Sequence, residues 1–210
     1  TRNHSSAASD VYKRQGYMFF YGIEQIFADP LSILRIWEGG LSFHGGFIGV
    51  LISFFIFSKK LNIGFFDLAD HIALAFPIGL GFVRIGNFLG GELLGRPTDL
   101  PWGMIFWSDP LQISRHPSQL YQAFFEGVVL FTILNLLVIK PKPKIFISGM
   151  FLALYGSFRI FTEIFRMPDS HIGFDFLDII TRGQLLSTPM VIIGLLLIFL
   201  SYRNKNETIS

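Results

Sequence analysis

Residues 80–96 place polar side chains at the end of a long apolar segment. The stretch contains Arg84, with Asn87 one helical turn further on and Glu92 about two turns beyond Arg84. If the helix continues, all three side chains face one space. A charged group inside a membrane-length segment costs at least ~2.5–3.5 kcal/mol, so it faces a polar cavity or a partner. The stretch therefore predicts a polar site at the end of a membrane span.

A second apolar segment carries Arg159, Glu163 and Arg166 at spacings of four and seven residues, which places them on one helical face. Two interpretations remain open. The three can form ion pairs that let the helix enter the membrane, with Arg166 at the interface. Alternatively, Arg84 and Arg159 form a fork for a phosphate, because the guanidinium group matches phosphate geometry. We expect the phosphate site.

Histidines stand at the ends of two predicted helices. His44 is followed by two glycines at a helix start, where free N–H groups suit an anion. It can act as a general base, or it can hydrogen-bond neighbouring backbone. His116 precedes Ser118, whose hydroxyl is suited to capping the next helix. Nearby aromatic residues fit an interfacial belt: Trp102, Trp107 and Tyr121.

The composition is that of a membrane protein. Of 210 residues, 51% are hydrophobic and only 15% are charged, against about 25% charged in an average soluble domain. The net charge of +2, without a basic patch that includes aromatic residues, argues against nucleic acid as a partner. The chain has no cysteine, which excludes disulfides, thiolate metal sites and a nucleophilic thiol of its own.

No metal or cofactor is predicted. His171, Asp175 and Asp178 have spacings of four and seven residues in a loop that contains glycine, and this pattern is weak evidence for a metal site. We therefore expect the chemistry to rest on side chains alone.

Apolar runs of about 20 residues predict an all-α, polytopic transmembrane bundle with about five complete spans. These spans are residues 41–57, 66–94, 120–139, 145–165 and 185–202. Residues 16–27 are expected to be the end of an earlier helix, and residues 31–40 a short amphipathic connection. Residues 1–15 are predicted to be a non-native or disordered leader, and residues 16–210 a single catalytic domain that lacks its first spans.

Positive residues predict the orientation, because cytoplasmic loops of membrane proteins are rich in lysine and arginine. They follow the first, third and fifth spans, so we expect the C-terminus in the cytoplasm. These residues are Lys59, Lys60, Lys140, Lys142, Lys144, Arg203 and Lys205. In this orientation the polar groups in or next to the spans gather near the outer leaflet, and we expect the site there.

Four motifs resemble those of the prolipoprotein diacylglyceryl transferases. They read GGLSFHGG at 39–46, RIGNFLGGE at 84–92, RHPSQLY at 115–121 and YGSFRIFTEIFR at 155–166. The resemblance implies an enzyme of the bacterial inner membrane, with seven spans in the complete family. Such an enzyme transfers the diacylglyceryl group of phosphatidylglycerol to the lipobox cysteine of a prolipoprotein signal peptide. A thioether forms, and glycerol 1-phosphate leaves.

The resemblance also implies site residues. His44, Arg84 and Arg159 fall on catalytic positions, with His44 or a neighbour helping to deprotonate the thiol. The expected substrate-binding residues are Arg84, Asn87, Glu92, His116, Tyr155, Glu163 and Arg166. Glu92 and Glu163 are expected to orient the arginines. Two positions depart from the family pattern: Gly90 stands where asparagine is usual, and Gln122 where many members have glutamate.

Two other classes of function remain open. A transporter or channel would carry polar groups through the full depth of the membrane and often a repeated half-structure. No repeat is visible in the sequence. A non-catalytic lipid-binding membrane subunit would look similar to the enzyme, and only an activity assay separates the two.

Overall fold

The computed structural model describes residues 43–167, 174–176 and 180–207. They belong to two compact units that divide between Phe65 and Phe66. The prediction of a single domain over residues 16–210 stays a prediction. The expected leader at 1–15, the partial helix at 16–27 and the connection at 31–40 lie outside the described residues.

Helix α3 (Phe43–Leu61) is the described helix of the first unit. It ends at Asn62, whose φ of 53° is left-handed. The N–H of Asn62 donates to the carbonyl of Lys59, and the N–H of Ile63 donates to that of Ser58. This pair of bonds closes the helix after the two lysines, as in a Schellman motif.

Helix α4 (Phe65–Leu89) has 25 residues, so it is about 37 Å long and exceeds the ~30 Å of a bilayer core. It ends at Gly91, whose φ is 65°. The N–H groups of Gly91 and Glu92 donate to Phe88 and Asn87 at 3.1 and 2.9 Å, which forms another Schellman motif. The predicted helix over 66–94 is therefore too long, and Glu92 lies beyond its end.

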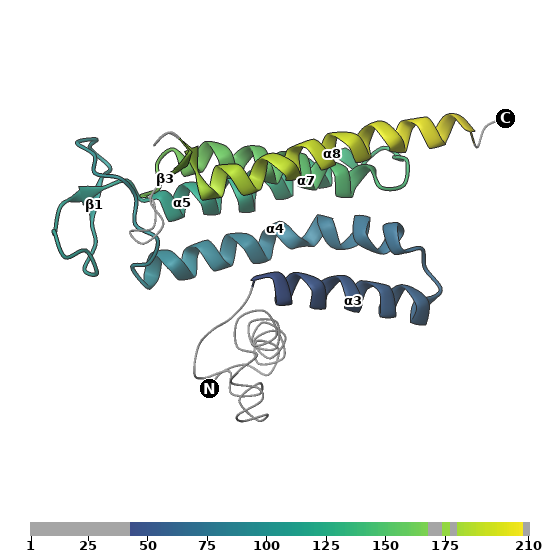
Figure 1. The fold of residues 1–210 in the computed structure, drawn as a ribbon, viewed down its shortest axis with the longest axis horizontal. Helices are drawn as coiled ribbons and strands as arrows, with labels where there is room; N and C mark the ends of the chain where they lie inside the picture. Colours follow the sequence, from purple (N-terminus) through teal and green to yellow (C-terminus); the bar gives the residue numbers. More distant parts are fainter. Residues whose placement is uncertain (1–42, 168–173, 177–179, 208–210) are drawn as a thin grey trace, which may run out of the picture. The chain divides into compact units, whose positions relative to one another are not determined.

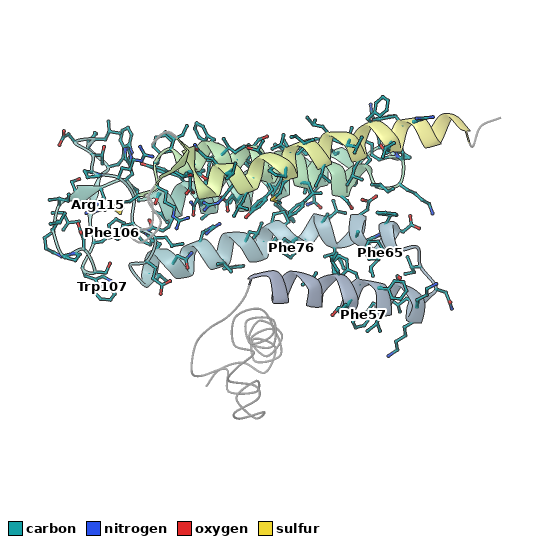
Figure 2. The ribbon with its side chains drawn as sticks, in the orientation of Figure 1. Phe57, Phe65, Phe76, Phe106, Trp107 and Arg115 are labelled. Atoms are coloured by element: carbon teal, nitrogen blue, oxygen red, sulfur yellow. The ribbon has the colours of Figure 1, made fainter. Side chains whose placement is uncertain are left out.

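The loop after α4 carries a short antiparallel pair, β1 (Met104–Ile105) and β2 (Ser114–Arg115), in which Met104 pairs with Arg115. Figure 2 labels Phe106, Trp107 and Arg115 in this region, beyond the end of α4. Further backbone bonds join the loop to the segment just after helix α7 (Phe146–Glu163): Arg96 N–H donates to Phe165 at 2.9 Å, and Met167 N–H donates to Leu94 at 3.0 Å.

The next helical run is continuous but changes type. It consists of α5 (Ser118–Gln122), the π-helix η3 (Ala123–Val129) and α6 (Leu130–Leu137). A π-helix is wider than an α-helix, is rare, and occurs often at functional sites. Here it lies in the middle of a predicted span.

Helices α7 (Phe146–Glu163) and α8 (Arg182–Glu207) lie side by side along their length (Figure 1). Between them are β3 (Phe174–Phe176) and β4 (Ile180–Thr181), which pair antiparallel. Thr181 and Gln184 form a capping box at the start of α8, because each side chain accepts the other's backbone N–H.

Three helical stretches in the described part of the chain are long and apolar enough to cross a membrane. They are Phe65–Leu89, Ser118–Leu137 and Gly183–Arg203. The other two predicted spans coincide with α3 and α7. Helix α7 carries Arg159 and Glu163 near its end, and these charges lower its hydropathy.

The interior of the second unit divides into an apolar and a polar part. The apolar cluster contains Ala73, Leu130, Leu134, Phe146 and Ile147. The buried polar residues include Ser118, Gln119, Gln122, Glu126, Thr162, Glu163 and Arg166. The second group lies at the start of α5, in η3 and at the end of α7. It forms a polar interior at one end of the helices.

The opposite end of α4 also carries charge, although the sequence predicts that the polar groups of the spans gather near the other leaflet. Asp70 accepts backbone N–H bonds from Ile145 and Ser148, each at 2.8 Å, and so caps the start of α7. Asp67 pairs with the exposed Lys144 at 2.8 Å. Both acids therefore have structural partners.

Candidate functional site

Arg84 and Arg159 meet at one buried carboxylate, that of Glu126. Glu126 lies in η3 and is completely buried. Its Oε2 accepts from Arg84, with both Nε and Nη2 at 3.0 Å. Its Oε1 lies 4.0 Å from Arg159 Nη1 and accepts from the Thr162 hydroxyl at 3.5 Å. The two arginines, from α4 and α7, therefore share one counterion.

The backbones of α4 and η3 touch beside this pair. A Cβ on Gly127 would lie 2.9 Å from the Cα of Gly81, so only glycine fits. Gly127 is next to Glu126, and Gly81 is one turn before Arg84. This close approach of two backbones brings the carboxylate within reach of the guanidinium group.

Glu163 is the second buried carboxylate of the cluster. Its Oε2 lies 2.9 Å from Arg159 Nη2 and 3.7 Å from Arg166 Nη1. A Cβ on Gly183 would lie 2.7 Å from Glu163 Oε1, so the carboxylate packs against the first turn of α8. A helix N-terminus favours negative charge, which helps to hold Glu163 in place.

The carboxylates described here do not bond every guanidinium nitrogen of this cluster. In the described part of the chain, the guanidinium groups of Arg84, Arg159 and Arg166 face the carboxylates of Glu126 and Glu163. Arg159 Nη1 is buried and makes no hydrogen bond within the described part of the chain. The cluster is suited to a monoanion, such as a phosphodiester, that would accept from this nitrogen.

Tyr155 lies one turn before Arg159 on α7 and joins the same cluster. Its hydroxyl is close enough to Arg84, Glu126 and Arg159 to interact with all three. Its ring stacks on Phe151 at a centroid distance of 5.8 Å. The predicted site residues Arg84, Tyr155, Arg159, Glu163 and Arg166 thus come together in the structure.

His116 lies in a neighbouring aromatic group. Its Nδ1 is 3.2 Å from the hydroxyl of Tyr121, which also accepts from Trp102 Nε1 at 2.8 Å. Its ring is 5.2 Å from that of Phe165, the residue before Arg166. The side-chain contacts of His116 are therefore aromatic, at the edge of the charged cluster.

The two other predicted residues of the 84–92 motif have different surroundings. Asn87 is half-buried, and its carbonyl accepts the bond that ends α4. Glu92 is exposed; its backbone carbonyl accepts from Gln119 Nε2 at 2.5 Å. The described carboxylate partner of Arg84 is Glu126, and the expectation that Glu92 orients Arg84 finds no contact in the structure.

Some predicted residues cannot be placed in the cluster. His44 belongs to α3, in the first unit, and its side chain lies outside the described part. Its predicted role stays a prediction. His171 and Asp178 lie outside the described residues, and only the backbone of Asp175 is described.

Glu126 is a buried acid that the predicted site does not include, and Gln122 was noted only as a departure from the family pattern. Glu126 is an acid inside the apolar run 120–139, and the rule that drew attention to Arg84 applies to it equally. Gln122 is completely buried, and neither amide atom has a hydrogen-bond partner among the described residues. Both side chains point to a polar interior along α5 and η3.

Comparison with known proteins identifies the family. The sequence profile of prolipoprotein diacylglyceryl transferases matches residues 9–200. The chain belongs to this family. Membership confirms the sequence-based prediction of the family, of a polytopic helical membrane protein and of a transferase.

Individual members of the prolipoprotein diacylglyceryl transferase family are similar along most of the chain. A phosphatidylglycerol–prolipoprotein diacylglyceryl transferase of Teredinibacter turnerae is 52% identical over 91% of this chain and 66% of its own length. That of Pseudomonas syringae pv. syringae is 52% identical over 90% of this chain and 71% of its own length. That of a Marinomonas species is 54% identical over 86% of the chain and 67% of its own length. The chain thus spans about two thirds of the length of these relatives.

Proposed function

We propose that this chain transfers the diacylglyceryl group of phosphatidylglycerol to the lipobox cysteine of prolipoproteins. The observation that carries the proposal is the pairing of Arg84 and Arg159 around Glu126, with the buried Arg159 Nη1 making no hydrogen bond among the described residues. The phosphodiester of phosphatidylglycerol carries a negative charge, and one of its oxygens can accept a hydrogen bond from this nitrogen. Family membership supports both substrates, which the names of the relatives mention.

In the proposed mechanism, Arg84 and Arg159 bind the phosphate and stabilise the charge that grows on it as it leaves. The lipobox thiolate attacks the carbon of the diacylglyceryl group that is bonded to the phosphate oxygen. The C–S bond forms while the C–O bond to the phosphate breaks, and glycerol 1-phosphate departs with the electron pair. The chain has no cysteine of its own, so the thiol comes from the substrate.

The remaining residues are assigned to support this step. Glu163 orients Arg159 and Arg166 through its ion pairs. Tyr155 and Asn87 donate hydrogen bonds to the phospholipid, and Glu92 and His116 border the path of the substrate. His44 or a neighbour accepts the proton of the thiol, because thiolate is the nucleophile.

We further propose that the protein lies in the bacterial inner membrane, with its C-terminus in the cytoplasm and the arginine cluster toward the outer leaflet. The lysines in the last turn of α3 and those after α6, together with Arg203 near the end of α8, support this orientation by the positive-inside rule.

The test is a transfer assay. The chain is expressed with the part of the Pseudomonas syringae relative that it does not span, and membranes are incubated with phosphatidylglycerol and a lipobox peptide. Mass spectrometry should find a diacylglyceryl-cysteine adduct. A peptide with serine in place of the cysteine is the control and should stay unmodified.

Arg84→Ala and Arg159→Ala should each abolish the adduct while the protein still inserts. Normal transfer by either variant would overturn the proposal that Arg84 and Arg159 together bind the phosphate. An inserted, folded chain that makes no adduct would instead support the lipid-binding interpretation.

A further inference from the structure

We propose that Glu126 is a positioning residue that holds Arg84 and Arg159 together as a fork for one phosphate. This inference rests on the proposed function and adds to it a residue that none of the four family motifs contains. Glu126 acts through the arginines and does not touch the substrate.

The contacts divide the carboxylate between the two arginines. Oε2 pairs with Arg84 through two guanidinium nitrogens at 3.0 Å. Oε1 faces Arg159 Nη1 at 4.0 Å and the Thr162 hydroxyl at 3.5 Å. Two guanidinium groups repel each other in a low-dielectric interior, and a negative charge between them removes that repulsion. Glu126 therefore sets the distance between the arginines.

The backbone fixes the position of Glu126 itself. It lies in the π-helical turn η3, beside the contact of Gly127 with Gly81. Because this contact joins backbone to backbone, α4 and η3 approach each other closely beside Glu126. The backbone thus places the carboxylate within reach of Arg84, as a positioning role requires.

Glu126 does not accept a hydrogen bond from every donor of the two arginines. At 4.0 Å, its distance to Arg159 Nη1 is an ion-pair distance and too long for a hydrogen bond. That nitrogen is buried and has no hydrogen-bond partner in the described part of the chain. Glu126 orients Arg159 and leaves a donor for the phosphate.

The test compares Glu126→Gln, which keeps the shape and removes the charge, with Glu126→Asp, which keeps the charge. Asp67→Asn is the matched control, because it removes a partly exposed acid and its ion pair at the other end of α4. Each variant is made in the chain that is expressed with the remaining part of the Pseudomonas syringae relative. The kcat and the KM for phosphatidylglycerol are then measured in the transfer assay.

Glu126→Gln makes the cluster more positive, so anion binding should not weaken and KM should stay the same or fall. Misplaced arginines should nevertheless lower kcat by ten-fold or more. Glu126→Asp should recover part of this loss, and Asp67→Asn should match the unsubstituted chain.

Three results would overturn the inference. One is an unchanged kcat in Glu126→Gln. Another is a rise in KM that accounts for the whole loss, since this would make Glu126 a simple binding determinant. The third is loss of folded protein in both Glu126 variants, which would make the carboxylate a structural group. A failure of the proposed function shows separately, as absence of the adduct with the unsubstituted chain.

Discussion

The carboxylate of Glu126 lies 3.0 Å from the guanidinium group of Arg84, although 42 residues separate them in the chain. The pair joins the end of α4 to the π-helical turn after α5. An ion pair with one partner fully buried and the other 13% exposed is costly to break, because the remaining charge would lose its counterion. The site and the packing of these two helices therefore depend on each other.

Arg84→Lys should separate charge from geometry. Lysine keeps the positive charge but lacks the planar fork that pairs with Glu126 through two nitrogens. We expect transfer to fall about 100-fold, equivalent to ~2.7 kcal/mol in the barrier. The rate of adduct formation measures the loss, and a rate within two-fold of the unsubstituted chain would show that charge alone suffices.

The helices were predictable because each apolar run is long enough to be recognised by composition. The end of α4 was not, because it depends on the left-handed conformation of Gly91 and on two backbone bonds. The sequence around 89–92 contains two glycines, and nothing in the apolar pattern says which of them ends the helix. Glu92 was therefore placed on a helical face that it does not occupy.

The arginines of the site were predictable for a similar reason, since a charge inside an apolar run stands out. Their shared partner, Glu126, was not predicted. Helical spacing identifies neighbours on the same helix, which favours Glu92 and Glu163 over a residue on another helix. Glu163 does pair with Arg159, four residues away. The π-helical turn that carries Glu126 has no recognised sequence signal, so its geometry had to come from the structure.

Acidification should loosen the loop between α4 and α5. Arg115 donates two bonds to Asp109 at 2.8 and 3.0 Å, and these hold the pKa of Asp109 below its ordinary value, assisted by the N–H groups of Leu111 and Ile113. A depressed pKa stabilises the fold above the unfolded-state pKa, near ~4. This contribution should disappear as the pH falls through the still lower folded pKa.

Limited proteolysis of the loop measures this effect between about pH 6 and about pH 3. This range includes the pKa of a free aspartate, which is ~3.9. Cleavage should increase at the acid end in the unsubstituted chain. Asp109→Asn, which cannot ionise, should be cleaved readily at every pH. Equal protection of both proteins across the range would show that the Asp109–Arg115 pair does not hold the loop.

Trp107 should contact lipid headgroups. It is 76% exposed and stands in the loop beyond α4 (Figure 2), whereas Trp102 is bonded to Tyr121. Tryptophan prefers the membrane interface. In vesicles with brominated acyl chains, the fluorescence of a variant that keeps only Trp107 should be quenched. Full fluorescence, equal to that in unbrominated vesicles, would place the residue in water.

Gly127→Ala should weaken the fold where α4 and η3 touch. The added Cβ would lie 2.9 Å from the backbone of Gly81, and overpacking of this kind costs roughly 1–3 kcal/mol. The matched control is Gly79→Ala in α4, where a Cβ meets nothing within 4 Å. Because alanine favours a helix by up to ~1 kcal/mol over glycine, Gly79→Ala should be neutral or stabilising.

Thermal unfolding in detergent separates the two variants: the midpoint should fall for Gly127→Ala and stay or rise for Gly79→Ala. Transfer activity should follow the same order, because a displaced η3 moves the Glu126 carboxylate away from Arg84. If Gly127→Ala unfolded at the same temperature and kept full activity, the contact of the two backbones would have no part in building the site. A loss of activity without a loss of stability would instead assign the contact to the geometry of the arginines alone.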